Sequence, residues 1–458
     1  FIVQTQIFTV HKRHLGLRAP TVLAVGFALT ILVGALVLML PVSAADGQIT
    51  PFLDALFTAA SASCVTGLVT VSTAVHWSVF GKCVILLLIQ IGGLGFMSVA
   101  AIASFVLRRT ITLHERMVMS AGLNLSDGGG IVRLTRRVLF GTFIIEGTGA
   151  VLLSCRFVPH YGFPKGITMG VFHAVSAFCN AGFDLMGTPD DPFQSLIGWA
   201  EDPLVNITVM ALIVLGGLGF FVWSDVWDKH SFCRLRLHTK IVLTATAGLL
   251  LFGFGWTLLF EWSNPATLGA FDTPHKLLAA AFESVTLRTA GFNTIDLGAL
   301  TGPSQAVSCL LMFIGGSPGS TAGGIKTVTA AVLVLTAISA FCGRTTVSAF
   351  GRTIAPRSIM NAVTLLMAGG VLCLVGACAI AGIEDAPFHQ CLFEAVSAFG
   401  TVGVSMGLTP TLSAASRVIL IVMMYMGRVG VLTLGVAVFM RRREPPRLKY
   451  PDADVFIG

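Results

Sequence analysis

The chain has 458 residues, of which 55% are hydrophobic and only 11% are charged. This charged fraction is about half of that found in soluble globular proteins. The composition therefore argues against a soluble protein and indicates a chain that crosses a membrane many times. The formal net charge of +7 is accounted for by the distribution of lysine and arginine described below, so we expect no nucleic-acid partner.

Apolar runs long enough to cross about 30 Å of hydrocarbon recur along the chain. We predict eight transmembrane helices, at 19–40, 79–107, 134–158, 203–227, 238–262, 303–340, 359–382 and 413–440. The first run is followed by Ser43-Ala44-Ala45, but it is longer than the core of a signal sequence and is kept as a helix. Four shorter runs are predicted to be re-entrant segments, at 52–63, 167–178, 275–287 and 387–398.

Lysine and arginine fall mostly on one side of these predicted helices. Alternate loops receive 21 of the 29 basic residues, at the N-terminus and at 108–137, 229–240, 344–357 and 441–449. Cytoplasmic loops carry such an excess, so both termini are predicted to be cytoplasmic. The ten cysteines contain no C-x-x-C pair, and they predict neither a disulfide framework nor a zinc site.

Four stretches of the sequence resemble one another: "LFTAASASCVTGL", "VFHAVSAFCNAGF", "AFESVTLRTAGF" and "LFEAVSAFGTVGV". Their shared glycines are Gly67, Gly182, Gly291 and Gly403, and each is followed by a second landmark: Gly92-Gly93, Gly216-Gly217, Gly315-Gly316 and Gly427-Arg428. The repeat predicts four units of helix, short re-entrant helix, glycine loop and helix. We place the units at 1–115, 116–230, 231–345 and 346–440, followed by a tail at 441–458. The predicted fold is all-α, with the four units in a pseudo-fourfold ring around one pore.

Such a ring of glycine loops suits the passage of a cation. Backbone carbonyls replace the water shell of a cation without burying side-chain charge, and glycine permits the dihedral angles that aim them at an axis. The negative dipole end of each re-entrant helix would also face the cavity. A single glycine more often serves helix packing, but four at a regular spacing favour a filter. One glycine per loop predicts weaker selectivity than the two of a tetrameric potassium channel.

Several motifs make the reading more specific, among them "RTAGFNTID", "SAFGTVGVSMGLTP", "GGSPGSTAGGIK", "MGRVGVLTLG" and "RLKYPDADVFIG". Together they resemble the membrane subunit of Ktr-type potassium transporters, within the Trk/Ktr/HKT superfamily. The resemblance runs from about Leu17 to Gly458. Without an extra N-terminal pair of spans it favours the Ktr branch, with a Trk-type potassium/sodium transporter as the alternative.

The resemblance implies a potassium uptake path within each subunit, a homodimer, and a location in the cytoplasmic membrane of a prokaryote. Potassium would be bound by backbone carbonyls of four filter strands: Cys64-Val65-Thr66-Gly67, Cys179-Asn180-Ala181-Gly182, Arg288-Thr289-Ala290-Gly291 and Gly400-Thr401-Val402-Gly403. Cys64 departs from the usual Thr-Val-Thr-Gly, and we expect it to change only the innermost binding site.

Regulation is expected to come from a partner, because the predicted cytoplasmic loops are too short to hold a nucleotide-binding domain. The resemblance implies a cytosolic RCK-type ring that binds a nucleotide of the ATP, ADP or NAD type, and no cofactor is expected in this chain. Arg441-Arg442-Arg443 and the tail to Gly458 are candidates for docking the ring or the second protomer. The alternative is a solvated basic anchor.

The predicted gate is a run of small residues that interrupts the sixth predicted helix: Gly315-Gly316-Ser317-Pro318-Gly319-Ser320-Thr321-Ala322-Gly323-Gly324. Pro318-Gly319 cannot continue a helix, so the run is expected to lie across the pore below the filter. Gly92-Gly93 and Gly216-Gly217 are expected to lie in continuous helices, which would make the third unit the broken one. A single broken unit favours a gated pore over an alternating-access carrier, whose broken helices come in pairs.

Three basic residues lie within or beside this region. The alignment places Arg428 level with Gly316, deep in the bilayer, where an arginine is costly. The resemblance implies that it faces the pore beside the loop, and the alternative is a structural pair with an acid such as Glu146. Lys326 is expected to extend to the cytoplasmic interface as a solvated anchor. The Arg288 side chain is expected to point behind the pore helices toward Glu283 or Glu394.

Two enzyme-like patterns overlap the same run. Residues 315–319 match G-x-S-x-G, which would make Ser317 the nucleophile of an intramembrane serine hydrolase. That site needs a preceding strand and a histidine base, whereas the flanks resemble membrane helices. A P-loop fails because Ile325 separates Gly324 from Lys326-Thr327. We therefore expect the protein not to be an enzyme.

Overall fold

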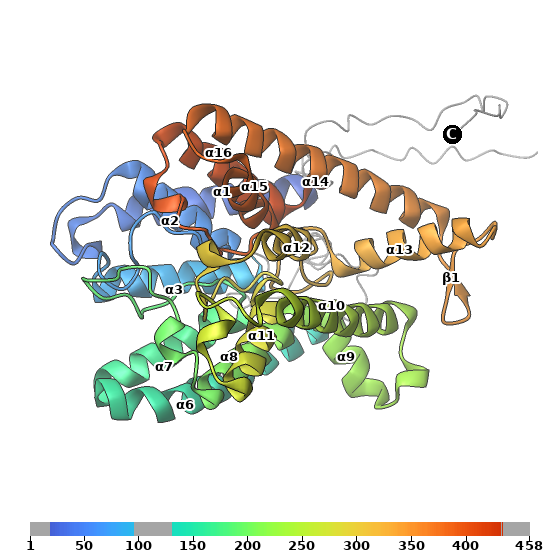
Figure 1. Cartoon of the computed structure of the whole chain (residues 1–458), viewed down its shortest axis with the longest axis horizontal. Coiled ribbons are helices and arrows are strands. Elements are labelled where there is room, and N and C mark those ends of the chain that lie inside the picture. The colour runs from blue at the N-terminus through green and yellow to red at the C-terminus, as the bar shows by residue number, and fades with distance from the viewer. Residues whose placement is uncertain (1–18, 96–130, 432, 434–458) are drawn as a thin grey trace, which may run out of the picture.

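Figure 1 shows a computed structural model of the chain, which describes residues 19–95, 131–431 and 433. The described part is almost wholly helical. Parts of the predicted helices at 79–107 and 413–440 lie outside the described residues, as do the whole tail at 441–458 and Arg441-Arg442-Arg443. The two short strands, β1 (Ser348–Ala349) and β2 (Arg352–Thr353), pair antiparallel in a hairpin beyond helix α13 (Thr327–Phe341).

Four helices are long and apolar enough to cross a membrane, and each opens one of the four sequence units. They are α1 (Ala19–Leu38), α6 (Ile131–Tyr161), α10 (Leu237–Glu261) and α14 (Pro356–Ile383). Large apolar side chains such as Leu29, Leu251 and Val371 are more than half exposed on them, as lipid-facing residues would be. A fifth span results if the bent pair α8 (Pro203–Leu218) and α9 (Phe220–Lys229) is counted as one. The membrane-helix class is confirmed, whereas the described residues give fewer than the eight spans predicted.

Each long helix is followed by a short helix that packs against it. The short helices are α2 (Phe52–Cys64), α7 (Phe163–Phe178), α11 (Thr273–Thr286) and α15 (Phe388–Gly400). They match the four predicted re-entrant runs to within a few residues. Prolines explain their sharp starts, since Pro51 and Pro387 directly precede α2 and α15, and α7 and α11 carry proline in their first turn.

The inner helices of three units end at equivalent glycines. Helices α3 (Val79–Leu94), α8 and α16 (Ala414–Val429) end at Gly95, Gly219 and Gly430, whose φ angles are +83°, +94° and +91°. Only glycine adopts this conformation readily, and at Gly219 the chain turns by 91° between α8 and α9. The expectation that Gly216-Gly217 lie in a continuous helix is therefore wrong, whereas Gly92-Gly93 lie within α3, which ends at Gly95, and the rest of the predicted helix at 79–107 lies outside the described residues. The third unit differs in having a longer insertion, between α12 (Gly302–Phe313) and α13.

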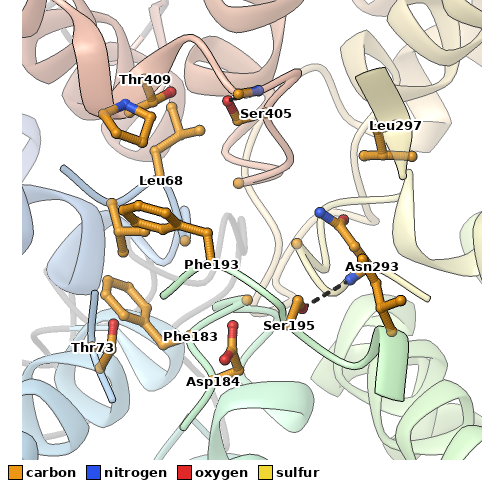
Figure 2. A pocket seen from close by; sticks show the side chains of 18 of the residues that line it. Leu68, Thr73, Phe183, Asp184, Phe193, Ser195, Asn293, Leu297, Ser405 and Thr409 are labelled. Carbon is orange, nitrogen blue, oxygen red and sulfur yellow. Dashed lines mark hydrogen bonds between the residues drawn. The ribbon is translucent and has the colours of Figure 1, made fainter. Parts of the chain in front are cut away.

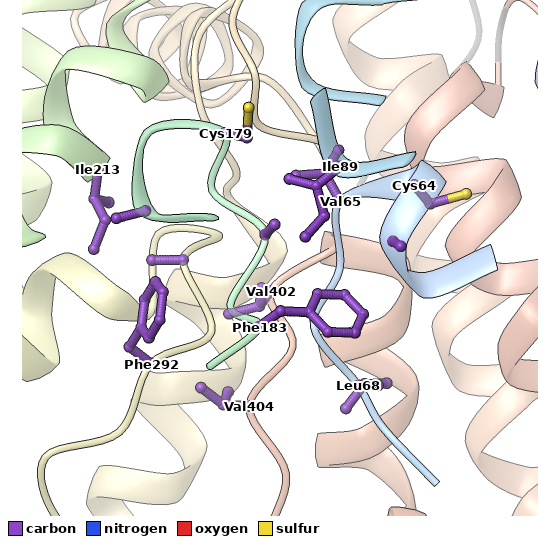
Figure 3. Close-up of a cluster of buried hydrophobic side chains, with 14 of the residues drawn as sticks. Cys64, Val65, Leu68, Ile89, Cys179, Phe183, Ile213, Phe292, Val402 and Val404 are labelled. Carbon is purple, nitrogen blue, oxygen red and sulfur yellow. The ribbon is translucent and has the colours of Figure 1, made fainter. Parts of the chain in front are cut away.

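Buried side chains from all four units meet around the loops that follow the short helices (Figure 3). Cys64 and Ile89 come from the first unit, Ile213 from the second, Phe292 from the third and Val402 from the fourth. All are at most 2% exposed. These side chains pack on one side of the four loops and hold them in place. The backbones of the loops face one another on the other side.

Candidate functional site

The loops after the four short helices share one backbone conformation. In each loop a residue other than glycine adopts a positive φ: 58° at Val65, 58° at Asn180, 70° at Thr289 and 52° at Thr401. Two residues later stands a glycine with a positive φ: 98° at Gly67, 68° at Gly182, 85° at Gly291 and 92° at Gly403. A left-handed residue other than glycine costs about 1–2 kcal/mol. Because this unfavourable conformation occurs at four equivalent positions, we infer that the surrounding structure imposes it.

The four glycines follow one another in a closed cycle. A Cβ atom added to each would approach the carbonyl oxygen of the residue before the next glycine. The distances are 2.5 Å from Gly67 to Ala181, 2.8 Å from Gly182 to Ala290, 2.6 Å from Gly291 to Val402 and 1.9 Å from Gly403 to Thr66. No side chain fits at any of these points, because real Cβ atoms do not come within 3.0 Å of such a neighbour. One carbonyl from each unit thus stands against the glycine of its neighbour.

One hydroxyl group in each unit braces the glycine loop. The Oγ atoms of Ser176 and Ser397 donate to the carbonyls of Phe183 and Val404 at 2.7 and 2.6 Å. In the third unit the Thr286 hydroxyl donates to the Phe292 carbonyl at 2.6 Å. In each case the acceptor belongs to the residue after the glycine, and in the first unit Ser61 accepts from the Gly67 N–H at 3.0 Å.

Sequence reasoning missed these braces, although a signal for them was present. Ser61, Ser176, Thr286 and Ser397 occupy the same column of the four aligned stretches. Serine and threonine are common packing residues in membrane helices, so this column by itself does not indicate a brace.

Above the glycine cycle lies a cavity of about 240 Å³ that all four glycines line. Figure 2 shows Asp184, Ser195 and Asn293 around it, with the Asn293 N–H donating to the Ser195 hydroxyl at 3.1 Å. Two carboxylates, Asp184 and Asp296, belong to its lining, and none of the described residues that line it is lysine or arginine. Burial raises the pKa of Asp184 to about 6, against hydrogen bonds from the Met186 N–H and Ser195. The cavity is electrostatically suited to cations.

The predicted gate, residues 315–324 between α12 and α13, is held in place by the broken helix of the second unit. The interruption at Gly219 leaves helix-end carbonyls without intrahelical partners. The carbonyls of Gly217 and Gly216 accept from the N–H groups of Ser317 at 3.0 Å and Thr321 at 3.3 Å. In return the Phe220 N–H donates to the Gly319 carbonyl at 2.9 Å. The segment is therefore an ordered loop, which we call the intramembrane loop.

The same loop lies against the inner ends of two glycine loops. The Thr321 hydroxyl donates to the Phe178 carbonyl at 3.2 Å, where α7 ends. A Cβ atom at Gly323 would lie 2.3 Å from the Thr401 hydroxyl oxygen. Small residues are needed here because the loop is pressed against the second and fourth glycine loops.

Arg428 joins the intramembrane loop to the first unit. Its guanidinium donates to the carbonyls of Thr321 and Gly92, and to that of Gly93 at 3.2 Å. These contacts match the expected position beside the loop. The alternative pairing with Glu146 is wrong, since Glu146 instead accepts from the Gln90 amide at 3.1 Å. Among the described residues Arg428 forms no ion pair within 4 Å.

The two other basic residues also bond to the loop, contrary to expectation. The buried Arg288 side chain donates from Nη2 to the Gly315 carbonyl at 3.0 Å and to the Thr327 hydroxyl at 2.8 Å. It therefore does not pair with Glu283 or Glu394. Lys326 does not extend as a solvated anchor, because its Nζ folds back to the Ala322 carbonyl at 2.6 Å. Backbone carbonyls outside regular helices need hydrogen-bond donors, and those of the loop lie within reach of both side chains.

The serine hydrolase pattern is not assembled. The Ser317 hydroxyl is buried and has no hydrogen-bond partner among the described residues. The buried His173 is already engaged, with Nδ1 bonded to the Met169 carbonyl at 2.7 Å and Nε2 accepting from the Leu185 N–H at 3.3 Å. Because no described residue is hydrogen-bonded to the Ser317 hydroxyl, none is placed to activate it as a nucleophile.

Comparison with known families decides the class. Residues 5–444 match the TrkH family, described as "Cation transport protein". The chain belongs to the TrkH family. Two curated relatives of this TrkH-family chain cover nearly all of it. It is 42% identical over 439 residues to the Ktr system potassium uptake protein B of Bacillus subtilis, covering 96% of each chain.

A second relative and a solved structure extend the comparison. The TrkH-family chain is 40% identical over 457 residues to the potassium/sodium uptake protein NtpJ of Enterococcus hirae, covering 98% of this chain and all of that one. The crystal structure of the potassium transporter TrkH from Vibrio parahaemolyticus superposes with a TM-score of 0.70, at 17% identity, over 93% of this chain and 86% of that one. The predicted resemblance to Ktr-type transporters is confirmed, and the serine hydrolase alternative has no support. The chain is a multi-pass membrane transporter.

Proposed function

We propose that this TrkH-family transporter carries potassium into the cell through a pore at the centre of its four units. The observation that carries the proposal is the closed cycle of Gly67, Gly182, Gly291 and Gly403, in which one carbonyl of each unit stands against the next glycine. Oxygens gathered from four directions replace the hydration shell of a cation. In this proposal the units form a pseudo-fourfold ring, and their four predicted filter strands are the selectivity filter.

Potassium is favoured as the main substrate. The two relatives of highest identity among those above are named for uptake of potassium and of potassium or sodium. Coordination by backbone carbonyls without a buried carboxylate suits a weakly hydrated monovalent ion. The acidic cavity above the glycines would collect cations from outside. A potassium/sodium transporter is the second candidate, which the single glycine of each loop and the name of the second relative both favour.

The intramembrane loop and Arg428 form the proposed gate. The loop contacts the inner ends of the second and fourth filter strands, through Thr321 and Gly323. Arg428 adds a fixed positive charge that has no carboxylate within 4 Å among the described residues. A charge of this kind on a cation path raises the barrier to conduction steeply in a medium of low dielectric constant. Withdrawal of the loop and the arginine would open the pore.

Control from the cytoplasm is part of the proposal. The relative from Bacillus subtilis is named as part of a Ktr system. By analogy we place both termini of this chain in the cytoplasm, and we assign it a homodimer and a cytosolic RCK-type ring that binds ATP, ADP or NAD. The excess of basic residues on one side of the membrane supports this orientation.

Growth of potassium-uptake-deficient cells at low potassium tests the proposed function. We expect the wild-type chain, with a regulatory ring, to restore growth and a Gly291→Ser variant to lose it, because a side chain at Gly291 would strike the Val402 carbonyl at 2.6 Å. Gly248→Ser on α10 is the matched control, since a Cβ there meets nothing within 4 Å. Failure of the wild type in the membrane would contradict the proposal, and so would full activity of Gly291→Ser.

A further inference from the structure

Arg288 connects two parts of the site that lie far apart in the sequence. Its backbone belongs to the third filter strand, directly before the left-handed Thr289. Its side chain, in a residue only 7% exposed, donates from one nitrogen to the Gly315 carbonyl at 3.0 Å and to the Thr327 hydroxyl at 2.8 Å. Gly315 begins the intramembrane loop, and Thr327 is the first residue of α13 after it. One guanidinium nitrogen therefore holds both ends of the loop.

The two ends also bond to each other, so that the arginine holds them as one junction. The Thr327 hydroxyl donates to the Gly315 carbonyl at 2.9 Å, and the Thr327 N–H donates to the Gly316 carbonyl at 3.0 Å. The Gly315 N–H donates to the Ile325 carbonyl at 2.8 Å. If Arg288 were absent, the junction would keep its internal bonds and lose its attachment to the filter strand.

The filter strand itself does not require an arginine at this position. The equivalent residues of the other units are Cys64, Cys179 and Gly400, and each is followed by the same left-handed residue. None of these small side chains has the length to span to an inner helix end. Three filter strands adopt this conformation without a long side chain. The role of the arginine therefore lies in the contacts of its guanidinium with Gly315 and Thr327.

A small cavity adjoins the guanidinium. Its volume is about 20 Å³, and Arg288, Gly217 and Gly316 help to line it. The Nε and Nη1 groups of Arg288 have no hydrogen-bond partner among the described residues. The cavity has room for about one water molecule, so the contact between the guanidinium and the beginning of the loop is not fully packed, and two of its donor groups are unused within the described part of the chain.

We propose that Arg288 is a positioning residue that couples the third filter strand to the intramembrane loop and holds the loop beneath the filter. The inference deepens the proposed function and rests on it. For the loop to withdraw, Arg288 must release Gly315 and Thr327. Its loss therefore favours the open pore and leaves the coordinating carbonyls in place, so the maximum rate of uptake rises while the apparent affinity for potassium stays unchanged.

Rubidium uptake by potassium-uptake-deficient cells expressing the full-length protein tests the coupling, at varied rubidium concentration. Arg288→Cys installs the residue that the first two units carry, and we expect the maximum rate to rise about tenfold, the scale of one hydrogen bond from a charged donor. Arg288→Lys keeps a donor and should give a smaller rise. The apparent KM should change less than about twofold, since the filter carbonyls remain.

A second variant keeps the test independent of the filter strand. Thr327→Val removes one partner of Arg288, and with it the bond from that hydroxyl to the Gly315 carbonyl, without altering the filter, and its maximum rate should also rise. Thr336→Val, which removes a hydroxyl bonded within α13 at 2.7 Å, is the matched control and should leave the rate unchanged. In a background that lacks Gly316 to Thr321, Arg288→Cys should have no further effect, because the gate is already gone.

The possible outcomes separate the two proposals. Wild-type cells without uptake would overturn the proposed function. Wild-type uptake with unchanged or lower maximum rates in both Arg288→Cys and Thr327→Val, at normal membrane levels, would overturn the coupling. A changed KM with an unchanged maximum rate would instead assign Arg288 an electrostatic effect on the ion, and would also overturn it.

Discussion

The outer halves of the four units are alike, whereas their inner halves differ from one another. In the outer half the four glycine loops are alike, with one left-handed residue, one glycine and one hydroxyl brace each. In the inner half the first three units differ in the groups that bond their free carbonyls. The first unit's end is bonded by Arg428, the second by N–H groups of the intramembrane loop, and the third by Arg288.

The difference reflects what each half has to do in the proposed pore. Coordination of one ion from all sides needs equivalent oxygens, so the outer loops must be alike. A barrier needs to be present only once on the path, so one loop and one arginine suffice. The free carbonyls left by the interrupted helices supply the acceptors that hold these parts in place.

The largest effect on uptake is expected from removal of the charge at Arg428. Arg428→Gln loses the fixed positive charge and its donors to Thr321 and Gly92, and we expect potassium uptake to rise on the order of tenfold. Uptake should be measured against Arg344→Gln, an exposed arginine outside the site. Unchanged uptake by a folded Arg428→Gln protein would contradict the proposed role of Arg428 in the gate.

A smaller effect is expected from the hydroxyl braces, and it should be shared among the units. Ser176→Ala and Ser397→Ala each remove a bond to the residue after the filter glycine. We expect each to weaken the preference for potassium over sodium about fivefold, as for one net hydrogen bond. Competition between the two ions during rubidium uptake measures the preference. A large effect in one unit and none in the other would break the equivalence of the outer loops.

The smallest effect is expected at the outer cavity. Asp184→Asn and Asp296→Asn each remove one negative charge, and the apparent KM for potassium should rise about two- to threefold at low ionic strength. The rise should diminish in added salt of an impermeant cation, because surface charges are screened. Asp190→Asn is the control, since Asp190 is exposed and does not line the cavity. Equal KM values for all three variants would exclude electrostatic collection of cations by the cavity.

Local signals account for what was predicted correctly. The bounds of the short helices follow from apolar runs of limited length that begin at proline, and the position of each glycine loop follows from the internal repeat. The acidic cavity was not predicted, because the residues that line it beside the four glycines, among them Asp184, Ser195 and Asp296, follow no pattern that the four units share.

The amino-acid sequence by itself determined the family, the four short helices and the four glycines, because each depends on periodicity or on the conformational limits of single residues. Only the tertiary structure decided which groups the buried cations contact. The partners or surroundings predicted for Arg288, Lys326 and Arg428 were wrong in part. A long side chain binds whichever acceptor the fold brings within reach. The acceptors are carbonyls of the intramembrane loop at Gly315, Thr321 and Ala322, and carbonyls at the end of α3 before Gly95. The sequence around a glycine in an apolar run does not show whether the helix continues through it. That depends on whether neighbouring units supply hydrogen-bond donors for the carbonyls that a helix end leaves free.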